Sequence, residues 1–188
     1  MISNNNVSKK DSTISTSLVM LMSVTCGITV ANIYYAQPLL SEIAKFFRVS
    51  EGSIGMVAML TQIGYAAGMF FLLPLGDIKE RRSLIVFMLF VAAVALILMS
   101  IAFNMGILLF AAFAVGFTSI VPQLIVPFAA HLASPKERGK VIGNVMSGLL
   151  IGILASRTFS GIIGAAFGWR VVYIIAAIIS CEIVSIQN

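Results

Sequence analysis

The strongest constraint on this chain is an apolar run at 83–132, which holds a single ionisable residue, His131. An α-helix rises about 1.5 Å per residue, so about 20 residues cross the ~30 Å hydrocarbon core of a bilayer. A run of fifty residues is therefore too long for one crossing. Asn104 and Gly106 interrupt it, so we expect one membrane-spanning helix at 83–103 and another at 107–132.

Composition supports a membrane protein, because 60% of the residues are hydrophobic and only 10% are charged, against roughly 25% charged in a soluble domain. The net charge of +5 is compatible with nucleic-acid binding. The positive residues, however, lie in short segments between apolar runs, as in membrane proteins. We therefore expect no nucleic-acid partner.

Enzymatic and metal sites are not indicated by the sequence. Cys26 and Cys181 fall inside apolar runs and are interpreted as packing residues. The single histidine excludes a His-rich metal site, and no nucleophile–base pair or phosphate-binding loop is found. We expect no enzyme activity, no cofactor and no metal.

The remaining apolar runs complete an all-α membrane protein with six transmembrane helices. Residues 1–13 are polar and are predicted to form a disordered cytoplasmic tail. The apolar run that follows Lys9 and Lys10 is too long for a signal peptide. Residues 14–188 should form one bundle, with a mixed segment at 41–53 after the first helix. The expected helices are about 15–38, 54–75, 83–103, 107–132, 141–166 and 170–187.

The loops of six spans alternate between the two sides of the membrane, and positive residues collect on the cytoplasmic side. Three of them, Lys45, Arg48 and Arg170, fall on one side. The other side collects eight: Lys9, Lys10, Lys79, Arg81, Arg82, Lys136, Arg138 and Lys140. This difference predicts a multi-pass protein of the inner cell membrane with both termini in the cytoplasm.

The helix at 141–166 carries small residues at every fourth position. Such residues let helix backbones approach closely in lipid. The stripe is interpreted either as packing inside the bundle or as part of a moving interface. Its members are Gly148, Gly152, Ser156, Ser160 and Gly164, followed by Gly168 at the turn.

Arg157 is the one charged residue placed well inside a span. A charge at that depth costs roughly several kcal/mol unless it faces a partner or a wet cavity. The alternative is that its side chain extends to the outer surface. The first span carries polar groups at a similar height, and these are candidates for a substrate cavity, although the tyrosines also fit an interfacial aromatic belt. The candidates are Asn32, Tyr34, Tyr35 and Gln37.

Gln123 lies between Pro122 and Pro127 in the fourth span. Proline has no N–H, so these prolines free the carbonyls of Thr118 and Gln123, four residues earlier in each case. Unpaired backbone at membrane depth must be buried in protein or line a cavity. Gln123 is therefore a further cavity candidate, with a simple packing kink as the alternative.

The charged turn Gly76–Arg82 separates the second and third spans. It resembles the pattern Gly-x-x-x-Asp-Arg-x-Gly-Arg-Arg of the major facilitator superfamily, which occurs at this place. Asp77, Arg81 and Arg82 match the pattern. Three positions depart from it: Leu73, Ile78 and Glu80.

Two further segments, 32–38 and 168–170, are similar to a bacterial branch of drug or metabolite exporters within that superfamily. The antiporter pattern Gly-Pro-x-x-Gly-Gly aligns with 156–161, where Arg157 replaces proline, and the helix-four arginine of many proton antiporters aligns near Ala112. The resemblance therefore does not extend to the usual residues of proton antiport.

The resemblance implies one half of a twelve-span fold, with each half built from 3+3 inverted repeats and the substrate held between halves. It implies that Asp77, Arg81 and Arg82 form a cytoplasmic gate. The expected function is the N-terminal half of a secondary transporter that exports a small organic molecule by alternating access. It would need the missing C-terminal half. The alternatives are a truncated or frameshifted fragment without activity and a half-transporter that pairs with a second copy.

Overall fold

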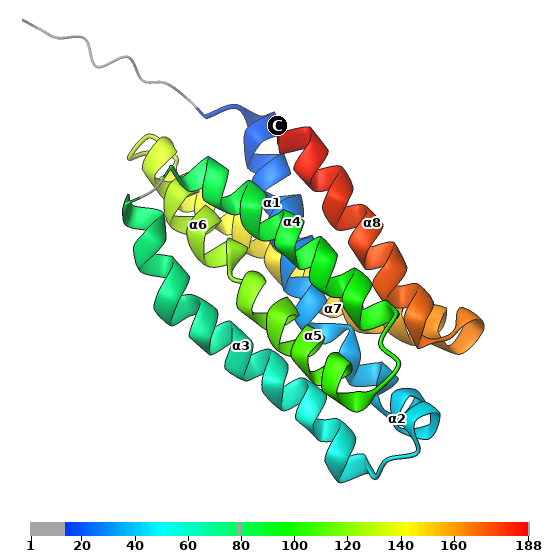
Figure 1. Ribbon diagram of the computed structural model, residues 1–188. Helices are drawn as coiled ribbons and strands as arrows, with labels where there is room; N and C mark the ends of the chain where they lie inside the picture. The colour runs from blue at the N-terminus through cyan, green and yellow to red at the C-terminus, as the bar shows by residue number, and fades with distance from the viewer. Residues whose placement is uncertain (1–13, 79, 188) are drawn as a thin grey trace, which may run out of the picture.

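The structure is a computed structural model that describes residues 14–78 and 80–187, with the side chains of 77, 78 and 187 left out. The predicted tail at 1–13 lies outside the described residues. All regular structure in the described part is helical (Figure 1). The helices are α1 (Thr16–Tyr34), α2 (Ala36–Phe47), α3 (Glu51–Ile78), α4 (Arg81–Ser100), α5 (Met105–Thr118), α6 (Val121–Leu132), α7 (Arg138–Phe167) and α8 (Trp169–Gln187).

These helices form six stretches that are long and apolar enough to cross a membrane. The first consists of α1 and α2, the fourth of α5 and α6, and the others of one helix each. The prediction of an all-α protein with six spans is confirmed. The beginning of α1 and the end of α8 lie at the same end of the bundle (Figure 1), as an even number of crossings requires.

The first span is longer than the sequence indicated. It was expected to end at residue 38, before a mixed segment, but α2 continues to Phe47. Pro38 lacks an N–H, so the carbonyl of Tyr34 has no donor four residues on, and the helix is interrupted only at Tyr35. Pro38 then falls in the first turn of α2, where proline is tolerated. The prediction of the end at residue 38 was wrong because proline shifted the helix boundary without ending the span.

Proline has the same effect in the fourth span. The helix stops at Thr118 and resumes at Val121. The carbonyl of Thr118 would accept a hydrogen bond from the N–H of residue 122, but Pro122 has no N–H. Pro122 lies in the first turn of α6, whereas Pro127 stays inside it. The first and fourth spans therefore each consist of two helices, and in each span the first helix ends four residues before a proline.

Three helix pairs make the most extensive contacts: α1 with α7, α3 with α5, and α4 with α8. Spans one, two and three can be matched in order with spans four, five and six. Under this match, the α1·α7 pair corresponds to the α3·α5 pair, and the α4·α8 pair corresponds to itself. The packing therefore repeats between the two groups of three spans. The two groups start on opposite sides of the membrane, so the repeat is inverted.

Glycines let the two helices of the α1·α7 pair, and the two helices of the α3·α5 pair, approach each other closely; we call these the flanking pairs. A Cβ at Gly152 would overlap the carbonyl oxygen of Gly27 on α1, and a Cβ at Gly148 would lie 2.5 Å from the carbonyl oxygen of Ser23. In the α3·α5 pair, a Cβ at Gly116 would overlap the carbonyl oxygen of Thr61. These backbones touch directly, as small residues allow in lipid.

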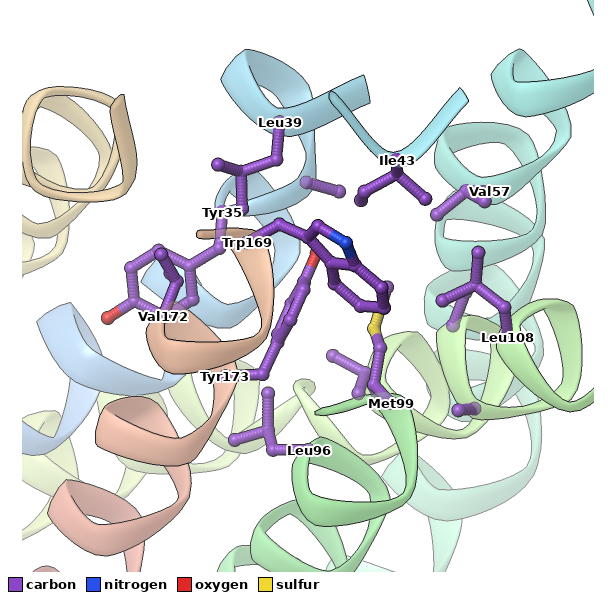
Figure 2. Packing of buried hydrophobic residues seen from close by; sticks show 14 of the residues in the cluster. Tyr35, Leu39, Ile43, Val57, Leu96, Met99, Leu108, Trp169, Val172 and Tyr173 are labelled. Atoms are coloured by element: carbon purple, nitrogen blue, oxygen red, sulfur yellow. The ribbon is translucent and has the colours of Figure 1, made fainter. Parts of the chain in front are cut away.

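Large side chains fill the bundle at the end where α2 lies, which we call the α2 end (Figure 2). Trp169 and Tyr173 of α8 pack there against Leu39 of α2 and Leu96 of α4. A second cluster, including Leu89 and Val145, fills the opposite end. The flanks are less covered: 22% of the α3 span and 17% of the α7 span are buried, against 56% of the first, third and fourth spans.

Candidate functional site

Arg157 lies on α7 with its side chain exposed, and its guanidinium carbon is 5.6 Å from the ring centroid of Tyr34. Tyr34 is the last residue of α1 and is half-buried, and Gln37, one turn further, is exposed in the first turn of α2. A guanidinium over an aromatic ring is held by the negative face of the ring. The break in the first span thus lies beside a cation that stacks on an aromatic ring, and the Gln37 amide is exposed one turn further along the chain.

The register of α1 and α7 fixes the height of Arg157. The two helices run parallel, with Gly148 against Ser23, Gly152 against Gly27, and Gly164 against the side chain of Leu39. Arg157 lies between the second and third of these contacts, so it is level with the end of α1.

The predicted small-residue stripe of α7 packs against α1 and α2 of the same bundle. Gly148 and Gly152 contact α1, and Gly164 contacts α2. Ser156 and Ser160 are buried, and their hydroxyls donate to the carbonyls of Ile153 and Ser156 in their own helix, at 2.7 Å in both cases. These residues hold the α1·α7 pair together.

Asn32 and Tyr35 are buried, unlike Arg157 and Gln37. Asn32 is 3% exposed, and neither its Nδ2 nor its Oδ1 has a hydrogen-bond partner. Tyr35 is 5% exposed, and its ring centroid lies 6.0 Å from that of Phe159 on α7. Two of the four polar candidates of the first span therefore lie inside the bundle in this conformation.

Gln123 contacts α3, at a place separate from Arg157. Its side chain is exposed, and Nε2 donates to Oη of Tyr65 at 2.9 Å. Tyr65 was not among the sequence candidates, although it directly follows Gly64, which packs on α5. Gln123 and Tyr65 thus join the fourth span to a flank helix by side chains.

A groove of about 690 Å³ runs along α1 and α7 and touches α8 at Ile179. Polar groups line it at Ser23, Asn144 and Ser147, while its other lining is mostly apolar. Neither Tyr34, Gln37 nor Arg157 lines it. The groove therefore includes one candidate for the substrate cavity, Tyr35, together with Ser156 and Phe159 on either side of Arg157, but not Arg157 itself.

The charged turn Gly76–Arg82 is only partly described. Lys79 and the side chain of Asp77 lie outside the described residues. Arg81 is half-buried and its Nε donates to the carbonyl of Gly76 at 3.3 Å, whereas Arg82 is exposed. Arg81 thus closes the turn that joins α3 to α4.

Charged residues at the α2 end have structural partners that sequence reasoning missed. Glu42 of α2 accepts a hydrogen bond from the backbone N–H of Trp169 at 3.1 Å, at the start of α8. Arg170 donates to the carbonyl of Ser100, the last residue of α4, at 2.9 Å and to that of Ala102, just beyond α4, at 2.6 Å. Its guanidinium also lies 4.1 Å from the ring centroid of Phe46. These contacts tie α2, α4 and α8 together.

The described residues contain no group of three His, Cys, Asp or Glu side chains that could hold a metal ion. The chemistry available at the Arg157 site is therefore that of a cation, an aromatic ring and an amide. Such groups bind and orient a solute through charge and hydrogen bonds.

Comparison with known families decides the identity of the fold. A family model described as the Major Facilitator Superfamily matches residues 19–181. The chain belongs to the major facilitator superfamily. The six-span bundle with its inverted repeat thus belongs to a family of membrane transporters.

Individual relatives within the superfamily are also named as transporters. The uncharacterized transporter YgaY of Escherichia coli O157:H7 is 44% identical over 173 residues, which cover 92% of this chain and 44% of YgaY. "Probable transporter SCO4007" of Streptomyces coelicolor is 37% identical over 160 residues, covering 85% of this chain and 37% of that protein. The chain thus spans less than half the length of these relatives.

A solved structure shows the same superfamily fold. It is a bacterial homolog of the human lysosomal transporter Spinster, in an inward-facing and unoccupied conformation. The TM-score is 0.80 at 16% sequence identity, over 91% of this chain and 42% of that one. At this identity the likeness concerns the fold alone, again over less than half of the longer protein.

Proposed function

We propose that this chain is the N-terminal six-helix half of a secondary transporter that exports a small organic molecule by alternating access. The Arg157 site is the observation that carries the proposal. A cation lies over a tyrosine ring within apolar spans, where a charged side chain is costly without a function, and the amide of Gln37 is exposed one turn beyond that tyrosine in the sequence. In superfamily members, solutes bind between two six-helix halves.

The exposed flanks support a requirement for a second six-helix unit. The chain corresponds to 44% of YgaY, and α3 and α7 are the least buried spans. The missing C-terminal half would cover them. A second copy of this chain is the alternative partner, and a fragment without transport activity is the third possibility.

The direction of transport and the type of membrane are proposed from the name of one relative and from the distribution of positive residues. A Helicobacter pylori protein named "Probable sugar efflux transporter" is 25% identical over 133 residues, which favours export. The excess of positive residues on one side supports cytoplasmic termini in an inner cell membrane.

A reconstitution experiment separates the three possibilities. The chain would carry Phe70→Cys on α3, where Phe70 is 75% exposed, with the exposed Cys181 changed to Ser. It would be placed in proteoliposomes alone or with the part of YgaY beyond the matched region. Loss of preloaded labelled sugars, organic acids and amines would be followed together with cross-linking.

Transport only in the mixed sample, without self cross-links, supports the missing-half proposal. Transport by the chain alone, with a specific two-chain product, identifies a working dimer. An absence of transport in both samples, with correctly inserted protein, would overturn the proposed function.

Asp77, Arg81 and Arg82 are proposed as the cytoplasmic gate, through charge contacts made in one state and broken in the other. In the active assembly, Asp77→Asn should strongly reduce transport while membrane insertion is retained. Glu80→Gln is the matched control, since Glu80 is an exposed carboxylate of the same turn. Equal transport rates in the two variants would remove Asp77 from the gate.

A further inference from the structure

Arg157 has no carboxylate partner among the described residues, and its recorded contact is the ring of Tyr34. Glu42 accepts the N–H of Trp169. The other described carboxylates lie at or near helix ends; they are Glu51, Glu80, Glu137 and Glu182. The positive charge of Arg157 is therefore not neutralised within the bundle.

Arg157 lies almost three turns from the nearer end of its helix. Arg157 precedes Phe167, the end of α7, by ten residues, or about 15 Å along the helix axis. Its guanidinium lies over Tyr34, which is followed by thirteen further residues of the first span, the last of them Phe47. The guanidinium therefore contacts a ring that lies well within the first span.

The groups around Arg157 suit a small anion with an apolar body. A planar guanidinium offers parallel N–H donors that match the two oxygens of a carboxylate. The Tyr34 ring holds the guanidinium from one side and offers apolar surface, and the exposed amide of Gln37 adds a hydrogen-bond donor and acceptor. A neutral or cationic solute would leave the charge of Arg157 unpaired.

We propose that the solute of this site is a small organic anion, and that Arg157 binds its carboxylate. This inference rests on the proposed transport function and adds the chemical class of the substrate. Tyr34 positions the guanidinium, and Gln37 contacts the same solute. The negative charge that the apolar span lacks is supplied by the substrate.

The test compares carboxylates with their neutral amides of the same shape: acetate with acetamide, benzoate with benzamide, and glutarate with glutaramide. Binding of each labelled probe would be measured in lipid nanodiscs, on the full chain alone and on the full chain together with the part of YgaY beyond the matched region. The variants are Arg157→Gln, Arg157→Lys and, as a control that removes a positive charge far from Arg157 on the same helix, Lys140→Gln. Lys140 is exposed near the start of α7.

We expect at least one carboxylate to bind at least tenfold more tightly than its amide. Arg157→Gln should abolish this preference, Arg157→Lys should keep part of it, and Lys140→Gln should leave it unchanged. A preference partly kept in Arg157→Lys would show that the loss in Arg157→Gln comes from the missing positive charge and not from misfolding. An amide that binds as tightly as its carboxylate, or a preference that survives Arg157→Gln, overturns the inference and leaves the transport function standing. Binding of none of the six probes counts against both.

Discussion

The flanking helix pairs and the α4·α8 pair belong to one bundle but are held together by different contacts. In α1·α7 and α3·α5, glycines bring backbones together directly. In α4·α8, contact depends on large buried side chains such as Tyr173 and on the hydrogen bonds of Arg170. Packing by glycine leaves no side chain that can adjust, whereas packing by large residues concentrates stability in a few positions.

The comparison predicts the largest single loss of stability at Tyr173, which is fully buried between α8 and its neighbours. Tyr173→Ala should lower the free energy of unfolding by about 3–5 kcal/mol, because it leaves a large cavity. Tyr173→Phe is the control: the hydroxyl has no hydrogen-bond partner, so its removal should not destabilise. Thermal unfolding in detergent, followed by circular dichroism, measures both; equal losses in the two variants would contradict the cavity explanation.

The glycine pairs should be intolerant of a single methyl group. Gly152→Ala and Gly116→Ala should each cost up to about 3 kcal/mol, because the new methyl meets backbone that cannot move aside. Gly143→Ala, on the same helix as Gly152, and Gly55→Ala on α3, in the same helix pair as Gly116, are controls with nothing within 4 Å of the added carbon. If the two flanking pairs are equivalent, both losses will be similar in the same unfolding assay; a large difference would break the equivalence.

At the α2 end, Arg170→Gln should cost about 2 kcal/mol, since hydrogen bonds from a charged group contribute roughly 1.5–3 kcal/mol. Glutamine is too short to reach both the Ser100 and the Ala102 carbonyls that Arg170 contacts. Lys45→Gln removes an exposed cation at the same end and should change the melting temperature little. Equal melting temperatures for the two variants would show that the Arg170 bonds contribute no stability.

The smallest expected effect has the opposite sign. Asn32→Leu should raise the free energy of unfolding by about 1 kcal/mol, because it removes two buried polar atoms that lack partners. Leucine has a similar size, so packing changes little. A loss of stability would mean that the amide of Asn32 has a favourable contact that this conformation does not contain.

The sequence predicted those parts of the fold that depend on local chemistry. Apolar run length sets the number of spans, and the missing N–H of Pro122 sets the break after Thr118. The small residues of α7 were expected to bring helices together, since their size alone permits it, and Gly148 and Gly152 lie against the backbone of α1. Each of these features is decided within a few residues.

Features that depend on distant partners could not be predicted. Glu42 and Arg170 were counted only as loop charges, because their partners lie far along the chain, at Trp169 for the first and at Ser100 and Ala102 for the second. The burial of Asn32 and the groove beside Asn144 likewise depend on how whole helices are rotated. Of the candidate site, only the height of Arg157 beside the end of the first span followed from spacing.

The stripe on α7 repeats almost the same surface at every turn, so it offers α1 several equivalent positions one turn apart along its length. The glycines alone would not fix the position of α1 along the axis of α7. What fixes it are the bulky residues at its end: the Tyr35 ring lies beside Phe159, and Leu39 fills the space over Gly164. The axial position of the first span, and with it the height of Tyr34 beside Arg157, is therefore set by these two large side chains together with the Ser23 hydroxyl, which donates to the carbonyl of Asn144, and not by the glycines that bring the helices together.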